Sequence, residues 1–304
     1  MTELFKRHAN NPLLTAKDWP YAINSVFNTA ATKFNDETLL LARCEDFRGH
    51  SHLTVARSKN GVDGWEIDKA PTFDKDPEHR EIWGVEDPRI TYLEEEKRYA
   101  ITYTAYSNDG PMIAIMTTTD FKSFERLGIA LPSENKDAAI FPRKINGKYA
   151  MLHRPVNGWG ANIWLSYSPD LVHWGGHHVV LRGRGGGWWD GGKVGGNCPP
   201  IETEQGWLIN YHAVRHTVSG GLYRMGLALL DKENPEKILK RGDEWIFAPK
   251  EPYEIFGDVN DVVFPCGWTV DEDGDTVNMY YGGADMCIAL ATGSIKEMLE
   301  YLNK

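Results

Sequence analysis

Positive charge and cysteine are scarce in this sequence of 304 residues, and it has no long apolar run. Its 33 Lys and Arg residues stand against 43 Asp and Glu residues. The resulting net charge of −10 argues against nucleic acid or an anionic membrane as a partner. The four cysteines lack the paired spacing of metal ligands, so we expect reduced, buried thiols. They are Cys44, Cys198, Cys266 and Cys287.

Targeting and membrane signals are lacking as well. No apolar run approaches the length of a membrane span, and Met1–Arg7 lacks the apolar core of a signal peptide. We therefore expect a cytoplasmic protein. The histidines do not form a helical His-Glu-x-x-His arrangement, and we expect no catalytic metal and no cofactor.

Aromatic residues, in contrast, are plentiful. They make up 12% of the chain, with 11 Trp and 13 Tyr. Aromatic rings stack on the C–H faces of sugars, but they are also favoured in β-strands. Composition leaves both explanations open.

One sequence pattern recurs along the chain. Residues 83–90 read Trp-Gly-Val-Glu-Asp-Pro-Arg-Ile, and weaker copies lie near residues 26, 137, 195 and 260. Each copy opens with small or polar residues, enters a short apolar run and is followed by a second and a third apolar run. Five copies, with a period longer than a strand and shorter than a domain, are typical of a repeat architecture.

The later runs of each copy predict antiparallel strands. Turn-forming pairs such as Asn146-Gly147 precede several of the second runs, which indicates tight hairpins. Several third runs end in a shared tail of Ser or Thr, Asp and an aromatic residue, which predicts a turn into a fourth, outer strand. The second runs are Leu39–Cys44, Tyr99–Tyr106, Tyr149–His153, Trp207–His212 and Val277–Tyr281. The third runs are His52–Ala56, Met112–Thr117, Asn162–Tyr167, Tyr223–Leu230 and Cys287–Thr292.

Three or four antiparallel strands per unit, repeated around a ring, predict an all-β fold. We expect a five-bladed β-propeller that occupies residues 1–304 as a single domain. Apolar residues at convincing helical spacing occur in Ser294–Asn303, so we also expect a short C-terminal helix. A β-sandwich is the alternative, and the shared tails argue against it.

Polar residues far apart in sequence would meet in the central channel, because the first strand of every blade lines it. Asp87, Arg143, Lys193 and Asp285 are examples. Positive side chains gather in these segments, and with histidine and tyrosine they are what a phosphate or carboxylate site requires. Any one of them could instead form a salt bridge. The set comprises Arg43, Arg48, Arg143, Lys144, Arg154, Lys193, Arg215, Arg224, His153, His212 and Tyr223.

The segment Glu86–Arg89 combines two carboxylates and a guanidinium. Because side chains alternate along a strand, we expect only one of Glu86 and Asp87 to face the channel. Pro88 favours the start of a strand, which would expose Asp87 at the channel mouth. A desolvated channel would raise the pKa of Asp87, and Arg89 would oppose this if it pointed inward. A structural turn aspartate is the alternative.

Two further segments have an open interpretation. Asn28 and Thr29 lie in an otherwise apolar strand, where they contact either a sugar or neighbouring blades. The glycine-rich run 182–193 lacks the Gly-Lys-Ser/Thr ending of a nucleotide phosphate loop. It is either a loop that holds Trp188 and Trp189 over a sugar or a plain linker.

With these motifs the chain resembles glycoside hydrolase family 130, the β-mannoside phosphorylases and related mannosidases. The resemblance extends from Asn11 to Asp285, and its motifs occur in the family order. It implies a five-bladed propeller, in agreement with the repeat count. The matching motifs are Val26–Asn28, Ser51–Ser58, Glu86–Arg89, Phe141–Ile145, His153–Pro155, Lys193, Tyr211–His212 and Tyr280–Asp285.

The resemblance also implies roles for single residues. Asp87 matches the family's general acid, which is thought to protonate the glycosidic oxygen through the 3-hydroxyl of the transferred sugar. In phosphorylase members inorganic phosphate, a co-substrate, attacks the anomeric carbon from the opposite face. Asn28, Arg43 and Asp285 resemble residues that hold the mannosyl unit, and we group Thr29 with them. The residues expected at the phosphate are Arg143, Arg154, Lys193, His212 and Tyr223.

The basic residues favour phosphorolysis over hydrolysis. An inverting glycosidase needs a second carboxylate to activate water, whereas phosphate is already an anion and needs cations to hold it. We expect an inverting phosphorylase that converts a β-mannoside oligosaccharide and phosphate into α-mannose 1-phosphate. The alternatives are a β-mannosidase of the same fold and a propeller that only binds sugar. The linkage, the acceptor sugar and assembly into a homo-oligomer stay open.

Overall fold

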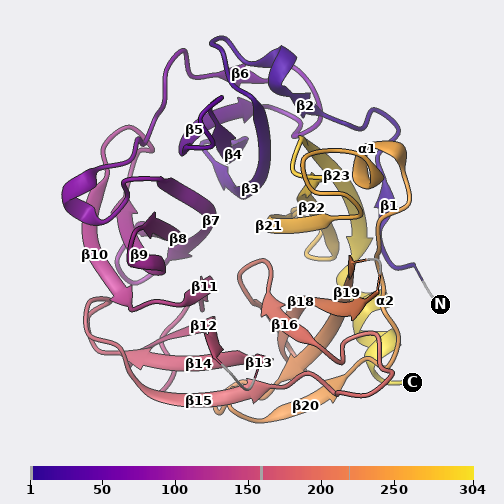
Figure 1. Ribbon diagram of the computed structural model, residues 1–304. Coiled ribbons are helices and arrows are strands. Elements are labelled where there is room, and N and C mark those ends of the chain that lie inside the picture. The colour runs from indigo at the N-terminus through magenta and orange to yellow at the C-terminus, as the bar shows by residue number, and fades with distance from the viewer. Residues whose placement is uncertain (1–2, 158–159, 219) are drawn as a thin grey trace.

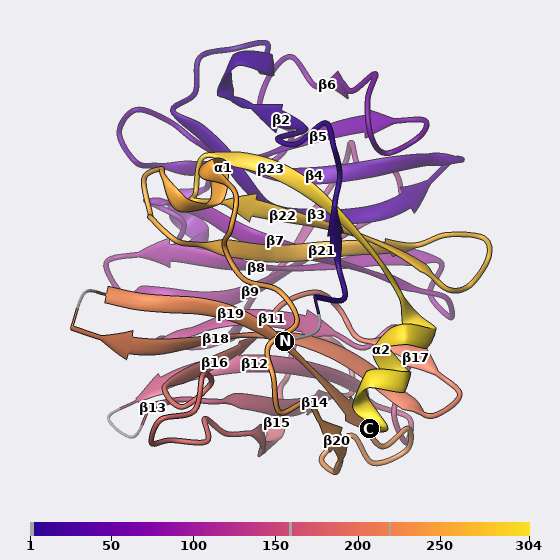
Figure 2. The same cartoon turned by 90° about the vertical axis from the view of Figure 1, so that its right-hand side faces the viewer.

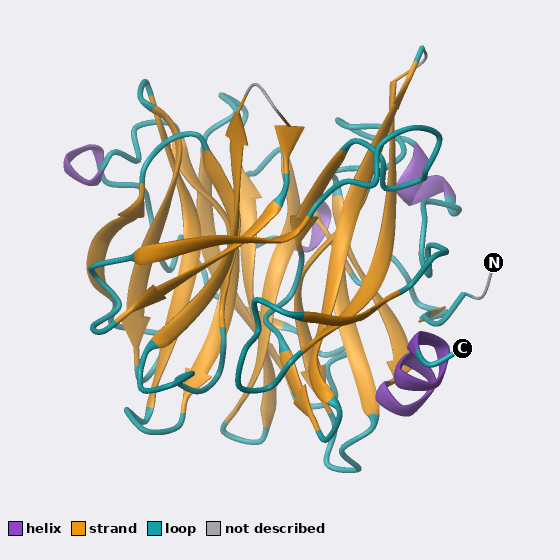
Figure 3. Ribbon diagram, turned by 90° about the horizontal axis from the view of Figure 1, so that it is seen from below, coloured by secondary structure: helices purple, strands orange, loops and turns teal. Residues whose placement is uncertain are grey.

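The computed structural model describes residues 3–157, 160–218 and 220–304, which form a ring of five β-blades around a central axis (Figure 1). The first strand of each blade faces the axis, and the later strands lie progressively further out. The predicted five-bladed propeller is confirmed, and the β-sandwich alternative is wrong. Seen from below, strands make up most of the ring (Figure 3), and the short helices lie at its outer edge (Figure 1).

The first three blades follow one another along the chain as antiparallel strands. Blade 1 consists of β3 (Ser25–Phe34), β4 (Glu37–Glu45), β5 (Ser51–Ser58) and β6 (Glu66–Ile67). Blade 2 consists of β7 (Gly84–Leu93), β8 (Arg98–Ser107), β9 (Gly110–Thr118) and β10 (Glu125–Leu131). Blade 3 consists of β11 (Asn135–Ile140), β12 (Tyr149–Asn157), β13 (Gly160–Ala161), β14 (Ile163–Ser168) and β15 (Gly175–Leu181).

The last two blades complete the ring. Blade 4 consists of β16 (Lys193–Gly196), β17 (Ile201–Thr203), β18 (Gly206–Thr217), β19 (Gly220–Leu230) and β20 (Ile238–Arg241). Blade 5 consists of β21 (Val263–Val270), β22 (Thr276–Gly283) and β23 (Cys287–Ser294). The N-terminal strands β1 (Lys6–Arg7) and β2 (Leu14–Thr15) pair with β23, so both ends of the chain are built into the same blade (Figure 2).

Helices occupy little of the described chain. They are the 3₁₀ turns η1 (Ala16–Asp18) and η2 (Pro77–His79), α1 (Pro252–Ile255) and α2 (Ile295–Leu302). The predicted C-terminal helix is confirmed as α2. It begins where the Ser294 hydroxyl accepts a hydrogen bond from the amide of Glu297, which satisfies one of the free N–H groups at the helix start. Within the described residues, no helix is both long enough and apolar enough to cross a membrane.

The predicted second and third runs fall on the second and third long strands of their blades, and the shared tails form the expected turns. Asp120 accepts hydrogen bonds from the amides of Lys122 and Ser123, and Asp170 does the same for residues 172 and 173. An aspartate that bonds to the backbone two and three residues ahead fixes a tight turn. This local chemistry explains why the tail recurs.

Cores of buried aliphatic and aromatic side chains fill the spaces between neighbouring blades. The largest contains Leu227 and Met279 from blades 4 and 5, and Met298 of α2 packs into it. The four cysteines are buried and free, as expected. The blades thus meet through apolar surfaces, and the polar side chains of the first strands are left to the axis.

A local irregularity of the first strands shapes the channel. The strands β3, β7 and β11 each carry a bulge at the same place, between Phe27 and Ala30, Glu86 and Arg89, and Lys136 and Ala139. A bulge inserts an extra residue and re-aims a side chain.

The bulged residues are Asn28, Asp87 and Asp137, with φ of 44°, 49° and 58°. Asn and Asp tolerate this left-handed backbone better than other non-glycine residues. Three blades therefore present an amide or a carboxyl at equivalent positions of the channel.

Candidate active site

Asp87 lies on the bulge of β7 and is 6% exposed. Its Oδ1 accepts one hydrogen bond from Nδ2 of Asn28, at 2.9 Å, and another from Nη1 of Arg43, also at 2.9 Å. Gly282 makes room for this arrangement, because a Cβ there would overlap Oδ1 of Asn28. The bulges of blades 1 and 2 therefore place an amide directly against the predicted acid.

Glu86 and Asp87 do not face opposite ways, contrary to the expectation from strand alternation. Arg43 contacts both, with its Nη2 3.1 Å from Oε1 of Glu86 and its Nη1 on Asp87. The bulge at Asp87 breaks the alternation, so both carboxylates reach the same guanidinium. Arg89 also turns inward, is 1% exposed and donates from Nη1 to the carbonyl oxygen of Asp87 at 2.8 Å.

The expected rise in the pKa of Asp87 is wrong. Burial pushes this pKa upward, but three positive side chains outweigh burial and hold it below the usual value of 3.8. They are Arg43, Arg89 and Lys136. Arg89 points inward, which is the orientation that the sequence left open. Asp87 is therefore ionised at neutral pH when no substrate is bound.

The pKa of Asp285 shifts in the opposite direction to that of Asp87. It follows β22 in a turn in which Ala284 and Asp285 both have left-handed backbones, with φ of 47° and 56°. Burial and the neighbouring carboxylates, Asp87 among them, raise the pKa of Asp285 to about 7, and Arg43 opposes this. We call Glu86, Asp87 and Asp285, gathered around Arg43, the acidic wall. Near neutral pH it combines an ionised Asp87 with a carboxyl that can hold a proton.

Four of the five residues expected at a phosphate come together in blades 3 and 4. Nζ of Lys193 lies 3.4 Å from the hydroxyl of Tyr223, whose ring stacks on His212 with centroids 6.2 Å apart. Burial lowers the pKa of Lys193, and the positive charge of Arg154 lowers it further. We call Arg154, Lys193, His212 and Tyr223 the basic wall.

His212 is fixed at both ring nitrogens. Its Nδ1 lies 2.9 Å from Oδ1 of Asn197, and its Nε2 lies 3.5 Å from Oδ2 of Asp137. Burial lowers the pKa of His212 to about 3, although Asp137 pulls it upward. The ring is therefore neutral at pH 7 before any anion binds.

Asp137 lies at the centre of the basic wall and was not predicted as a site residue. Its carboxylate pairs with Nε of Arg154 and lies 3.5 Å from Nη2 of Arg89. Burial raises its pKa, but Arg154, His212 and Arg89 outweigh burial and lower it. The repeat held a signal for this residue, since residue 137 opens the third copy of the unit as Asp87 lies in the second.

Two predicted site residues lie elsewhere. Arg143 bonds to Glu202 and Glu233 and packs over the ring of Trp207, because β11 ends at Ile140 and Arg143 lies in the turn beyond it. Thr29 is fully buried, and its hydroxyl donates to the carbonyl oxygen of Ala30 at 2.8 Å. Neither side chain joins the acidic or the basic wall.

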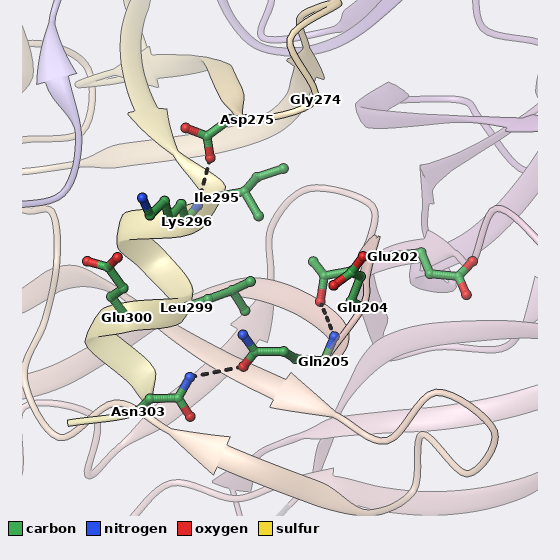
Figure 4. Close-up of a pocket in the computed structure, with 11 residues that line it drawn as sticks. Glu202, Glu204, Gln205, Gly274, Asp275, Ile295, Lys296, Leu299, Glu300 and Asn303 are labelled. Carbon is green, nitrogen blue, oxygen red and sulfur yellow. Dashed lines mark hydrogen bonds between the residues drawn. The ribbon is translucent and has the colours of Figure 1, made fainter.

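Two surface hollows lie away from these walls. The pocket in Figure 4, of about 580 Å³, lies between α2 and the turn from β17 to β18. Its polar groups bond to one another, as Asn303 does to Gln205, and it contains none of the predicted site residues. A second hollow of about 410 Å³ is lined by segments of all five blades, including Thr32, Tyr92 and Trp268, at the opposite ends of the first strands.

Among residues 3–157, 160–218 and 220–304, no cluster of three or more His, Cys, Asp or Glu side chains could hold a metal ion. The channel presents the carboxyl groups of the acidic wall and the hydrogen-bond donors of Arg154, Lys193 and Tyr223. Such donors can bind and orient an anion, and a carboxyl across from them can transfer a proton.

Comparisons with known proteins agree with this geometry. A family model described as beta-1,4-mannooligosaccharide phosphorylase matches residues 6–304. A 1,2-beta-oligomannan phosphorylase of Thermoanaerobacter sp. is 37% identical over 306 residues, covering 96% of this chain and 98% of the relative. A beta-1,4-mannooligosaccharide phosphorylase of Ruminococcus albus is 33% identical, covering 97% of this chain and 90% of the relative.

A solved structure extends the likeness to three dimensions. The beta-1,2-mannobiose phosphorylase of Listeria innocua, in complex with beta-1,2-mannobiose, is 33% identical to this chain. It superimposes with a TM-score of 0.90 over 98% of this chain and 99% of that one. The likeness therefore covers the whole ring and both walls of the channel.

Proposed function

The chain belongs to glycoside hydrolase family 130 and is a glycoside phosphorylase, and we propose that its channel cleaves β-mannosides with inorganic phosphate and inversion, releasing α-mannose 1-phosphate. The observation that carries this proposal is that the basic wall and Asp87 meet in one channel, where Arg89 donates to the carbonyl oxygen of Asp87 and lies 3.5 Å from Asp137. Phosphate attack needs an oriented anion on one face of the sugar and a proton on the other.

The proposed sugar site is the acidic wall. Asn28 and Arg43 already bond to Asp87, so a mannosyl unit beside them would exchange hydrogen bonds with all three. Asp285 shares Arg43 electrostatically and would complete the site from blade 5. These polar groups are buried or half-buried, and a hydroxyl-rich ring would satisfy them when it displaces water.

Asp87 must carry a proton when the glycosidic bond breaks. Before substrate binds, its pKa lies below 3.8. Phosphate bound by Arg154 and Lys193 would add negative charge to the same channel, and a nearby negative charge raises the pKa of a carboxyl. We propose that phosphate binding promotes protonation of Asp87, while Asp285, with a pKa of about 7, keeps a protonated carboxyl in the same wall.

The proposed proton path follows the family resemblance. Asp87 gives its proton to the 3-hydroxyl of the mannosyl unit, and the proton of that hydroxyl passes to the glycosidic oxygen. The bond between the anomeric carbon and that oxygen breaks while a phosphate oxygen forms a new bond from the opposite face. The acceptor leaves as a neutral alcohol, and the product is the α-anomer of mannose 1-phosphate.

Hydrolysis by the same walls is disfavoured. An inverting hydrolase needs a carboxylate base that can accept a proton from water on the face opposite the acid. Asp137 is the carboxylate within the basic wall, but it is paired with Arg154 and Arg89 and its pKa is lowered. A carboxylate so strongly stabilised as an anion is a weak base.

For the linkage we propose β-1,2. The support is that the 1,2-beta-oligomannan phosphorylase is 37% identical to this chain, against 33% for the beta-1,4-mannooligosaccharide phosphorylase. The solved structure with a TM-score of 0.90 also belongs to an enzyme named for the β-1,2 linkage.

The test is turnover of β-1,2- and β-1,4-linked mannobiose with and without inorganic phosphate, followed by ¹H and ³¹P NMR. We expect α-mannose 1-phosphate from the β-1,2 substrate and dependence on phosphate. Free mannose at equal rates with and without phosphate would refute phosphorolysis. Faster turnover of the β-1,4 substrate would overturn the linkage and leave the reaction intact.

A further inference from the structure

The basic wall contains a buried carboxylate, although it gathers groups suited to an anion. Asp137 is 2% exposed and contacts Arg154, Arg89 and His212. A fixed negative charge at this place repels an incoming phosphate. It must therefore do something else that outweighs the repulsion, or it would weaken the site.

The contacts of Asp137 show what it does to its neighbours. Its carboxylate accepts a hydrogen bond from Nε of Arg154. Because the guanidinium is planar and rigid, this contact also fixes the direction of its two Nη groups. Asp137 also faces Nε2 of His212, while Asn197 holds Nδ1 on the other side of the ring. One carboxylate thus orients two members of the basic wall.

Space around Asp137 is restricted as well. Gly195 lies on β16 where a Cβ would overlap both Oδ2 of Asp137 and the imidazole of His212. The backbone of blade 4 therefore approaches the pair as closely as glycine permits. This close approach leaves the carboxylate and the ring little freedom to take other positions.

We propose that Asp137 is a positioning residue for phosphate, which directs the Nη groups of Arg154 toward the anion and holds the His212 ring in place against Tyr223. This inference rests on the proposed function and adds a residue to it. Positioned donors gain affinity because their orientation is fixed before the anion arrives. Asp137 itself touches neither the sugar nor the phosphate.

Blade 4 offers a matched control in Asp190. Its carboxylate is fully buried and contacts Arg184 at 2.8 Å, Arg241 at 2.7 Å and the hydroxyl of Tyr211 at 3.1 Å. Like Asp137, it is held by two guanidiniums and one ring. Its arginines also bond to the carbonyl oxygens of residues 182 and 242. Asp190 is therefore a structural counterpart outside both walls.

The experiment compares Asp137→Asn with Asp190→Asn in the full-length protein. For Asp137→Asn we expect KM for phosphate to rise about ten- to hundredfold, by analogy with the outer partners that orient metal ligands. KM for the mannoside should stay near that of the wild type. Asp190→Asn should lower the melting temperature and leave both KM values unchanged.

Electrostatics alone predicts the opposite change in KM for phosphate. Removing a negative charge from an anion site should strengthen phosphate binding if position plays no part. A lower or unchanged KM for phosphate in Asp137→Asn would therefore overturn the inference. An equal rise of KM for phosphate in Asp190→Asn would also overturn it, because the effect would then be one of general destabilisation.

Gly195→Ala keeps the inference testable if Asp137→Asn does not fold. The added methyl displaces Asp137 and His212 without removing a charge, and we expect the same rise in KM for phosphate. An unchanged KM in this variant would contradict the positioning role. Calorimetric titration of the wild type with phosphate distinguishes failure of this inference from failure of the proposed function. If the wild type binds no phosphate, the proposed function itself is refuted.

Discussion

The two walls of the channel are built alike and serve different ends. Each contains a side chain of the opposite charge that contacts two of its members, Arg43 in the acidic wall and Asp137 in the basic wall. Arg43 holds Asp87 in its ionised form, while Asp285 keeps a raised pKa of about 7. Asp137 orients a guanidinium and an imidazole. Such a counter-ion thus controls protonation in one wall and side-chain direction in the other.

The largest effect should come from removing the acid. Asp87→Asn keeps the shape and the hydrogen-bond partners but cannot donate a proton, so kcat should fall by about 10²- to 10⁴-fold. The protein should still fold, but its melting temperature should fall, because the lowered pKa of Asp87 means that its paired charge stabilises the folded state. Steady-state kinetics and thermal unfolding measure the two effects. Retained activity would remove Asp87 as the acid and turn attention to Asp285.

The next effect sharpens the boundary of the basic wall. Lys193→Met removes one charged donor, which is worth about 2 kcal/mol, and should weaken phosphate binding about thirtyfold. Arg143→Gln is the control, since its guanidinium bonds to Glu202 and Glu233 outside the wall. Its KM for phosphate should match the wild type. An equal loss of phosphate affinity in the two variants would show that the basic wall is wrongly defined.

A smaller effect should connect the two walls. Bound phosphate adds negative charge to the channel and should raise the pKa of Asp87. Activity should therefore persist to higher pH at saturating phosphate than at limiting phosphate. Rate profiles between pH 5 and pH 9 measure this shift. Identical rate profiles at saturating and limiting phosphate would mean that bound phosphate does not affect the protonation of Asp87.

The last effect concerns stability rather than catalysis. The pKa of Asp285 is about 7 in the folded protein against an ordinary 3.8, so the folded state binds the proton more tightly. This contribution to stability is complete at low pH and is lost as pH rises through about 7. Asp285→Asn cannot ionise, so its stability relative to the wild type should increase between pH 5 and pH 8. Urea unfolding at both pH values measures the change, and a constant difference would contradict it.

Much of the fold could be predicted because it is repeated. Five copies of one pattern predict five blades, and tight turns such as Asn146-Gly147 separate strands that the structure confirms. Because the same strand pattern occurs several times, a copy with a weak pattern can be assigned from the stronger copies.

The site was less predictable, because its geometry depends on backbone irregularity. Simple alternation predicts that Glu86 and Asp87 point apart, and the bulge of β7 brings both to Arg43. The same bulge in blade 3 aims Asp137 into the channel. A bulge depends on pairing between strands, so a single strand's sequence does not reveal it.

Strand ends were a second source of error. Arg143 follows the apolar run of β11 closely, but the strand ends at Ile140 and the chain has turned away before the guanidinium. The direction of Arg89 was likewise open, and its inward turn lowers the pKa of Asp87. Single residues near an element's end are placed by tertiary contacts, which the sequence pattern does not contain.

Calorimetric titration of phosphate into Asp87→Asn and Lys193→Met tests the division of labour between the walls most directly. We expect Asp87→Asn to bind phosphate at least as tightly as the wild type, because it loses a negative charge from the channel. Lys193→Met should bind far more weakly. Equal losses in both variants, or full affinity in Lys193→Met, would contradict the separation of proton donor and anion site.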